Sequence, residues 1–144
     1  MKKISWFAIA FACSVHADSL PLPELAAPGV NDVRVTWYGV TTLLFDDGET
    51  KFLVDGFFSR VALDPDVPIA PDVAQIERMI GRADLAGLAG ITPVHSHFDH
   101  AMDLGEIAKR TGAVVVGSES TANIARGAGV DEAQVQFEAP GFVT

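Results

Sequence analysis

The alternation of hydrophobic and polar residues predicts antiparallel strands in the first part of the chain. Residues 33–38 have strand character, and residues 41–45 continue it after Gly39. Residues 46–49, Asp-Asp-Gly-Glu, are a turn signal between two apolar runs, and residues 51–54 supply the second arm of the hairpin. We therefore expect the fold to begin with short strands joined by tight turns.

Further along, apolar residues at helical spacing alternate with continuous apolar runs. Val73, Ile76, Met79 and Ile80 follow Asp72 at a helical period. The expected elements are a loop over residues 63–71, a helix capped by Asp72, a strand over 89–94, a helix over 104–111 capped by Asp103 and stopped by Gly112, a strand over 113–116, a helix from Ser120, its cap, to Arg126, and a strand over 134–137. This order predicts an α/β (α+β) fold, a sheet with helices on its outer face.

Composition and charge narrow the class of protein. The 144 residues are 49% hydrophobic, which suits a globular domain with a core, and the length fits one domain. The formal net charge is −9. An acidic chain is a poor ligand for nucleic acid or anionic membranes, because both require clustered lysine and arginine. We expect a small-molecule substrate instead, and the sequence leaves the oligomeric state open.

The amino terminus predicts an export signal over residues 1–17. A basic start precedes an apolar run over residues 4–15, and Ala17 supplies a small residue for cleavage. The run is too short for a bilayer span, which needs about 20 residues. We expect an exported protein, periplasmic or secreted, with its domain over residues 18–144. There are two alternatives to a cleaved export signal. The minor one is lipid attachment at Cys13, and the other is that the apolar run forms a buried amino-terminal helix.

Residues 95–100, His-Ser-His-Phe-Asp-His, contain three of the four histidines in the chain. Imidazole and carboxylate groups suit zinc or a similar transition metal, whereas calcium and magnesium prefer oxygen ligands. In an extended segment His95 and His97 point the same way, so both can contact one cation. No cysteine follows Cys13. This favours an open hydrolytic metal site over a closed structural one.

In its setting between an apolar strand and a helix, this segment resembles the HxHxDH signature of the metallo-β-lactamase superfamily. The resemblance implies an αββα sandwich with two metal ions, of which the chain would hold roughly the first half. It implies metal ligands at His95, His97, Asp99 and His100, the first two for one ion and the last two for the other. Asp99 would also act in catalysis by orienting the attacking water. Two zinc ions are expected, with manganese or iron as alternatives.

Two further segments extend the resemblance. Asp55 ends an apolar strand and matches the first-motif aspartate, which supports a ligating histidine; a plain turn residue is the alternative. Residues 37–42, Trp-Tyr-Gly-Val-Thr-Thr, resemble the branch of ascorbate-phosphate lactonases and N-acyl-phosphatidylethanolamine phospholipases, although Val40 stands where many members have histidine. The alternative for Trp37 and Tyr38 is that they are ordinary core residues. Phe57 and Phe58 could line a substrate pocket or pack under the loop.

The superfamily also uses a later histidine, a bridging aspartate and a final histidine, and no histidine follows His100. Asp103, Glu119 and Asp131 lie in no matching motif. Two interpretations stay open: an incomplete copy of a longer protein, or a short variant with one metal on His95, His97 and His100. We expect a metal-dependent hydrolase that uses activated water on an ester, lactone, amide or phosphodiester. The alternatives are a truncated or degraded non-catalytic metal-binding chain and an interaction protein with an exposed sheet.

Overall fold

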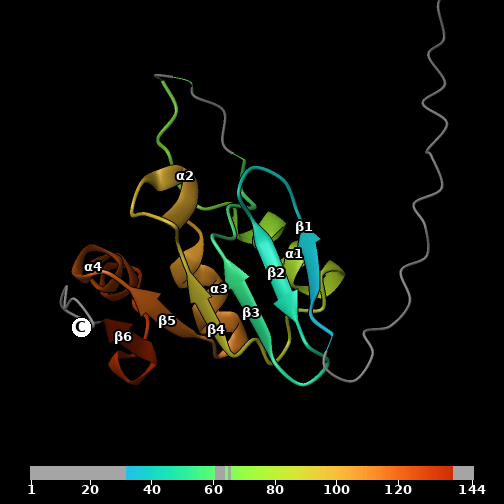
Figure 1. Ribbon diagram of the computed structural model, residues 1–144. Helices are drawn as coiled ribbons and strands as arrows, with labels where there is room; N and C mark the ends of the chain where they lie inside the picture. Colours follow the sequence, from blue (N-terminus) through green and yellow to red (C-terminus); the bar gives the residue numbers. More distant parts are fainter. Residues whose placement is uncertain (1–31, 61–63, 65, 138–144) are drawn as a thin grey trace, which may run out of the picture.

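The computed structural model describes residues 32–60, 64 and 66–137. The predicted export signal, Cys13 included, lies outside the described residues. The elements, in chain order, are β1 (Arg34–Trp37), β2 (Leu43–Asp46), β3 (Lys51–Val54), α1 (Val73–Arg82), β4 (Gly90–Thr92), α2 (Phe98–Ala101), α3 (Leu104–Thr111), β5 (Val114–Gly117), α4 (Glu119–Gly127), the 3-10 turn η1 (Glu132–Gln134) and β6 (Val135–Phe137) (Figure 1). Within this part of the chain, no helix is long and apolar enough to cross a bilayer.

The six strands form one sheet in the order β1-β2-β3-β4-β5-β6. The first three strands pair antiparallel, and β3 to β6 pair parallel. The β2–β3 turn is closed by side chains, because Asp46 Oδ1 accepts a hydrogen bond from Gly48 N, and Asp47 Oδ1 accepts bonds from Glu49 N and Thr50 N. The predicted α/β class and the predicted hairpin are both confirmed.

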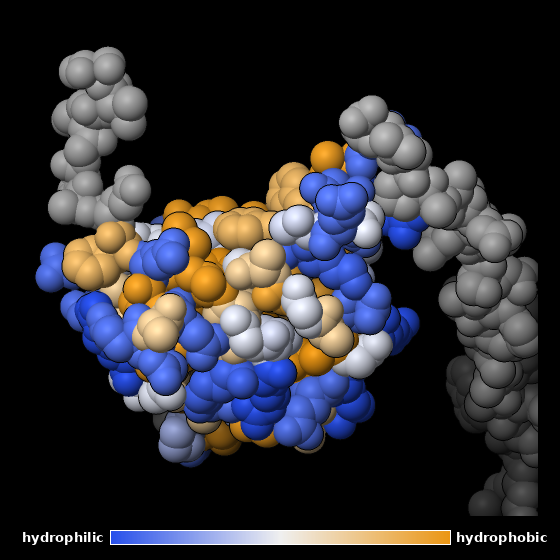
Figure 2. Space-filling model, turned by 90° about the horizontal axis from the view of Figure 1, so that it is seen from below, coloured by the Kyte–Doolittle hydropathy of each residue, from blue (hydrophilic) through white to orange (hydrophobic). Residues whose placement is uncertain are grey.

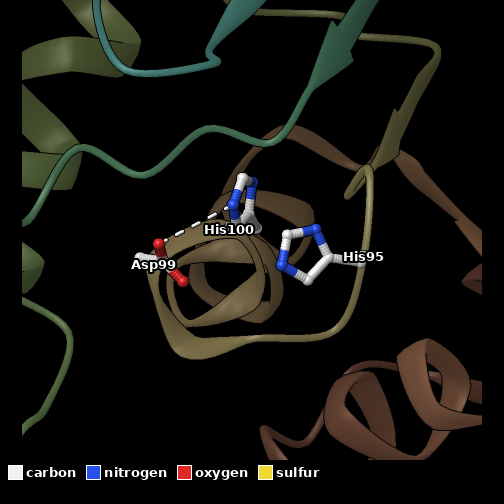
Figure 3. Close-up of side chains that lie close together, drawn as sticks. All are labelled: His95, Asp99 and His100. Carbon is white, nitrogen blue, oxygen red and sulfur yellow. Dashed lines mark ion pairs between the residues drawn. The ribbon is translucent and has the colours of Figure 1, made fainter.

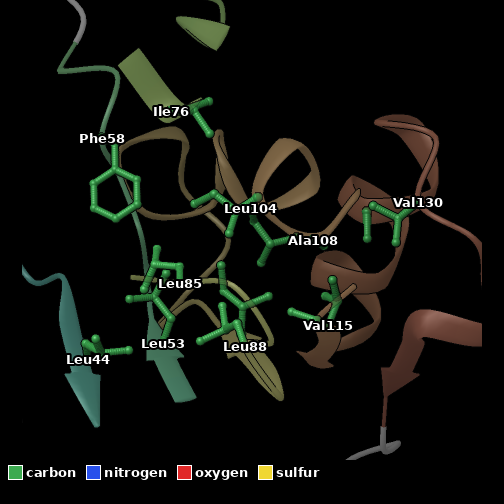
Figure 4. Close-up of a cluster of buried hydrophobic side chains, with 14 of the residues drawn as sticks. Leu44, Leu53, Phe58, Ile76, Leu85, Leu88, Leu104, Ala108, Val115 and Val130 are labelled. Atoms are coloured by element: carbon green, nitrogen blue, oxygen red, sulfur yellow. The ribbon is translucent and has the colours of Figure 1, made fainter. Parts of the chain in front are cut away.

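One face of the sheet packs against helices to form the core. The strands contribute Leu44, Leu53, Ile91 and Val115 to this face, each nearly or fully buried. Helices α1, α3 and α4 cover these residues with their own apolar side chains, and the cluster is continuous across the sheet (Figure 4). Helices α1 and α3 lie behind the sheet in Figure 1. This is the single helical layer that the alternating pattern predicted.

The opposite face of the sheet is apolar and uncovered by the described residues. The register places Val35 beside Phe45 and Trp37 beside Leu43, on the face away from the helices. Val35, Trp37 and Val116 are exposed by 49%, 66% and 38%. Trp37 is therefore not a core residue. Figure 2 shows hydrophobic residues gathered in the upper part of that view, while hydrophilic residues dominate the lower part.

The hydrophobic pattern predicted the starts of the helices only in part. Asp72 caps α1 as predicted, because its side chain accepts a hydrogen bond from Gln75 N at 2.9 Å. The predicted cap of α4 at Ser120 is wrong: the cap lies two residues earlier, at Ser118, which accepts the capping bond from Thr121 N. Asp103 precedes α3 but makes no capping bond. The pattern also missed α2, a single turn, because so short a helix has no period to detect.

Parallel pairing brings the ends of β3, β4 and β5 to one edge of the sheet. Asp55 follows β3, residues 93–97 follow β4, and Ser118 follows β5. Helix α2 lies beyond the end of β4 at this edge (Figure 1). Side chains far apart in the sequence are therefore neighbours here, as expected of ligand sites in sheets with parallel strands.

Candidate metal centre

The histidine segment leaves the sheet abruptly after β4. Pro93 follows the strand, and Val94 N donates a hydrogen bond of 2.8 Å to the Asp55 carboxylate instead of continuing the ladder. The segment then turns into α2, whose first hydrogen bonds run from His100 N and Ala101 N to His97 O. One helical turn folds His100 back over the loop that carries the first histidine.

Three of the predicted ligands come together. His95, Asp99 and His100 each offer an atom, and these atoms lie within 4.8 Å of one another (Figure 3). The rings of His95 and His100 are tilted against each other with centroids 4.0 Å apart, and His100 Nε2 lies 3.7 Å from Asp99 Oδ2. His95 is exposed, Asp99 is half-buried and His100 is buried. The cluster is therefore open to solvent on one side.

His97, the fourth predicted ligand, contacts His95. His97 Nδ1 lies 3.0 Å from His95 Nε2, and the rings are edge-to-face with centroids 4.5 Å apart. The two rings thus lie on the same side of the loop, but His97 is not in the cluster of three. The predicted pairing, with His95 and His97 on one ion and Asp99 and His100 on a second, stays a prediction.

Asp55 fixes the orientation of His100. His100 Nδ1 lies 2.9 Å from Asp55 Oδ2 and 3.1 Å from Thr41 Oγ1. An ionised carboxylate only accepts hydrogen bonds, so Nδ1 carries the proton and Nε2 keeps its lone pair. This is the arrangement that metal-ligating histidines usually adopt. Thr41 was not predicted in this role, because a threonine in a turn carries no distinguishing sequence signal.

The backbone at Asp55 is in the left-handed region. Its φ is +62°, and Gly56 follows at φ +92°. The left-handed conformation costs a non-glycine residue about 1–2 kcal/mol. A Cβ at Gly56 would lie 2.8 Å from Ile107 Cδ1, so the chain passes tightly over α3 here. Such a strained position next to a cluster of potential ligands is typical of functional sites.

A second buried carboxylate, Asp103, contacts the residues that follow Gly56. It is fully buried and accepts hydrogen bonds from Phe58 N, Ser59 N and Ser59 Oγ, at 2.7, 2.7 and 2.6 Å. Burial raises the pKa of Asp103 above its ordinary value, and the bonds from Ser59 and Phe58 only partly offset that effect. Its position just before α3 predicts a helix cap, because aspartate is a preferred residue there, and the structure gives it a different role.

An apolar cavity of about 420 Å³ adjoins the histidine segment. Its lining consists of Ile69, Ser96, Phe98, Ala101, Met102 and Ile124. Phe98 also packs edge-to-face against Phe57, with ring centroids 6.3 Å apart. Phe57 and Phe58 are both buried and neither lines this cavity, and Phe58 belongs to the core.

The donor set fits a transition metal. Two imidazoles and one carboxylate are the mixture of nitrogen and oxygen ligands that zinc, manganese and iron accept. His100 Nε2 is free to bind because Nδ1 is engaged. Three protein ligands with an open side are also the usual arrangement of a catalytic site.

Comparison with known proteins agrees with the motif. The chain is 35% identical over 98 residues to a UPF0173 metal-dependent hydrolase of Heliobacterium modesticaldum, a match that covers 68% of this chain and 35% of that protein. A second UPF0173 metal-dependent hydrolase, from Pyrobaculum islandicum, is 30% identical over 105 residues, covering 71% and 40%. A third, from Staphylococcus aureus strain JH9, is 28% identical over 91 residues, covering 63% and 33%. The chain thus spans about a third of the length of these relatives. No family model matches it.

Solved structures include two partial likenesses. A metallo-β-lactamase of Cronobacter sakazakii with a HARLDQ motif matches with a TM-score of 0.42 and 21% identity, over 57% of this chain and 29% of that one. A B3 metallo-β-lactamase with an active-site glutamic acid matches with a TM-score of 0.44 and 27% identity, over 72% and 35%. With the motif at the end of a parallel strand and the relatives above, the chain belongs to the metallo-β-lactamase superfamily.

Proposed function

We propose that this chain carries the metal-binding part of a metal-dependent hydrolase. The observation that carries the proposal is the cluster of His95, Asp99 and His100, with Nδ1 of His100 held by Asp55 and Nε2 left to bind a cation. The UPF0173 relatives, which are called metal-dependent hydrolases, support the same activity. The substrate would be a small molecule with an ester, lactone, amide or phosphodiester bond.

Each side chain has a distinct part in this proposal. His95 and His100 bind the cation through nitrogen, and Asp99 binds it through a carboxylate oxygen or accepts a hydrogen bond from the attacking water. His97, in contact with His95, is placed to complete the set or to hold a second ion. A bound divalent cation lowers the pKa of water to about 7 and polarises the bond under attack. Zinc is the proposed metal, with two ions as the higher occupancy, and manganese and iron are alternatives.

Metal content and turnover test the proposal together. The purified chain, dialysed against zinc, manganese or iron, should retain one or two ions, and its hydrolysis of a panel of chromogenic esters, lactones, amides and phosphodiesters should depend on the metal. His100→Ala should lose the metal and the activity. Glu49→Ala, which changes an exposed acid in the β2–β3 turn, is the matched control and should retain both.

The two outcomes separate the open interpretations. A chain that takes up no metal at these histidines rejects the proposal altogether. A chain that binds metal but hydrolyses nothing in the panel favours the alternative, a non-catalytic metal-binding chain. Because the chain spans about a third of its relatives' length, hydrolysis by this chain alone is the more demanding half of the test.

A further inference from the structure

The Asp103 carboxylate uses both of its oxygens on a single short segment. Oδ2 accepts from the backbone N–H groups of Phe58 and Ser59, and Oδ1 accepts from the Ser59 hydroxyl. The residue sits at the start of α3 but leaves the helix uncapped. Asp103 thus bonds to residues 58–59, which are distant in the sequence, and not to the nearby N–H groups of α3. We therefore interpret it as an anchor for residues 58–59.

The anchored segment begins at Asp55. Residues 55–59 are held at one end by the Asp55 carboxylate, which binds Val94 N and His100 Nδ1, and at the other end by Asp103. Ser59 Oγ also accepts a hydrogen bond from Asp72 N, so the start of α1 is tied to the same point. Between these two anchors the backbone passes through the left-handed conformations of Asp55 and Gly56.

We infer that Asp103 is a positioning residue for the metal centre: by fixing residues 58–59, it holds Asp55 against His100. Without that anchor, the segment can relax from its left-handed conformation and withdraw the Asp55 carboxylate. Asp103 lies only three residues after His100 along the chain, so the short link between α2 and α3 joins the histidine to the residue that anchors its partner. The inference rests on the proposed function, because the role of Asp55 is to orient a ligand.

The substitution that tests this is Asp103→Asn. Asparagine keeps the shape of the side chain but loses the charge. With its oxygen facing the two N–H groups, its amide nitrogen cannot accept the hydroxyl proton of Ser59 as Oδ1 does. Ser59→Ala is a milder second variant, because it removes one hydrogen bond to Asp103 and leaves the two backbone bonds. It keeps the test decisive if Asp103→Asn does not fold. Val115→Ala, a buried change on β5, two strands away from β3, controls for loss of stability.

The first measurement needs no metal. In ¹⁵N NMR spectra of the metal-free chain, the imidazole of His100 should be the Nδ1–H tautomer, with its Nδ1–H protected from exchange. In Asp103→Asn, that proton should exchange at least about tenfold faster and the other tautomer should become populated. Val115→Ala should leave the His100 signals as in the wild type, because Val115 lies on β5, two strands away from the strand that leads into residues 55–59.

The second measurement is zinc affinity by competition with a chromophoric chelator. Removal of a partner that orients a metal-ligating histidine usually weakens binding about 10–100-fold, which is the expectation for Asp55→Asn. Asp103→Asn, one step further away, should weaken it about tenfold, and Ser59→Ala less. Val115→Ala should retain wild-type affinity while lowering the melting temperature.

The possible results separate this inference from the proposed function. If Asp103→Asn, or Ser59→Ala where the first variant does not fold, leaves both the His100 tautomer and the zinc affinity unchanged, Asp103 serves only the stability of the fold and the inference fails. If Val115→Ala shifts them equally, it fails as well. A wild-type chain that binds no zinc rejects the proposed function, and the metal-free NMR comparison then still decides whether Asp103 positions Asp55.

Discussion

At the scale of single residues, the unusual feature is a pair of buried carboxylates that hold the two ends of residues 55–59. Asp55 and Asp103 are both fully buried, and each accepts hydrogen bonds from backbone N–H groups far away in the sequence. An unpaired buried charge is strongly destabilising, so these bonds are what makes burial tolerable. Neither carboxylate stabilises a helix, which sets them apart from Asp72.

Glu106, in contrast, is a carboxylate that forms ordinary ion pairs with basic side chains on its own helix. It accepts a hydrogen bond of 2.6 Å from Lys109 Nζ and another from the Arg110 guanidinium, and the bond from Lys109 is the largest cause that lowers the pKa of Glu106 below 4.5. A lowered folded-state pKa means that the ion pair stabilises the fold fully above pH 4.5. This stabilisation is lost as the pH falls through the folded-state pKa.

Glu106→Gln should therefore lower the free energy of unfolding by about 0.5–1 kcal/mol at pH 7. The difference from the wild type should shrink to zero as the pH falls below the folded-state pKa, because both chains are then uncharged at this position. Urea unfolding at a series of pH values measures it, with Glu49→Gln in the exposed turn as the control. A difference that stays constant down to acidic pH would contradict the assignment.

At the scale of elements, α4 offers a direct comparison of two serines. Ser118 accepts the capping hydrogen bond from Thr121 N, whereas Ser120 lies exposed in the first turn. Ser118 Oγ also lies 3.4 Å from Ser96 Oγ, which ties the start of α4 to the histidine segment. The cap therefore contributes both to the helix and to the edge of the sheet where the candidate site lies.

Ser118→Ala should lower the free energy of unfolding by about 1 kcal/mol, the usual cost of a lost serine cap. Ser120→Ala should change it by less than about 0.5 kcal/mol, because the side chain is exposed and alanine favours a helix. Thermal and urea unfolding of both variants provide the measurement. Equal losses in the two variants would mean that the helix does not begin where the structure places it.

Sequence patterns predicted the elements well, and the reasons for the misses are specific. The strands and long helices were found because their apolar periodicity extends over several residues. This periodicity stays the same when the capping residue of a helix lies one or two positions away, so it does not locate the cap. Asp99 and His100 were placed in one cluster by a local motif. Thr41 and Asp103 were missed because their roles depend on partners 59 and 44 or 45 residues away, and no local pattern encodes such pairings.

At the scale of the whole molecule, the sheet is covered on one face only within the described residues. The uncovered face presents Val35, Trp37 and Val116, and the resemblance to an αββα sandwich implies a second sheet at this place. Apolar patches of this kind mark surfaces that another element covers or that promote association. This part of the predicted architecture stays a prediction.

The double substitution Val35→Thr and Val116→Thr should reduce binding of the dye ANS by the purified chain and its light scattering on concentration, because it makes the uncovered face more polar. Val67→Thr, at a residue 57% exposed in the loop before α1, is the matched control and should leave both signals near the wild-type level. Equal effects of the two changes would show that the face is not the source of the exposed apolar surface.

The closeness of His95, Asp99 and His100 along the chain has a consequence for how zinc affects folding. These side chains lie within six consecutive residues, so the unfolded polypeptide also carries them side by side and retains some affinity for the ion. Native-state stabilisation by a ligand depends on its preference for the folded form, and metal held by unfolded histidines reduces that preference. A rise in melting temperature with added zinc would consequently understate the true affinity, and only the contribution of long-range partners such as Asp55 would appear in it.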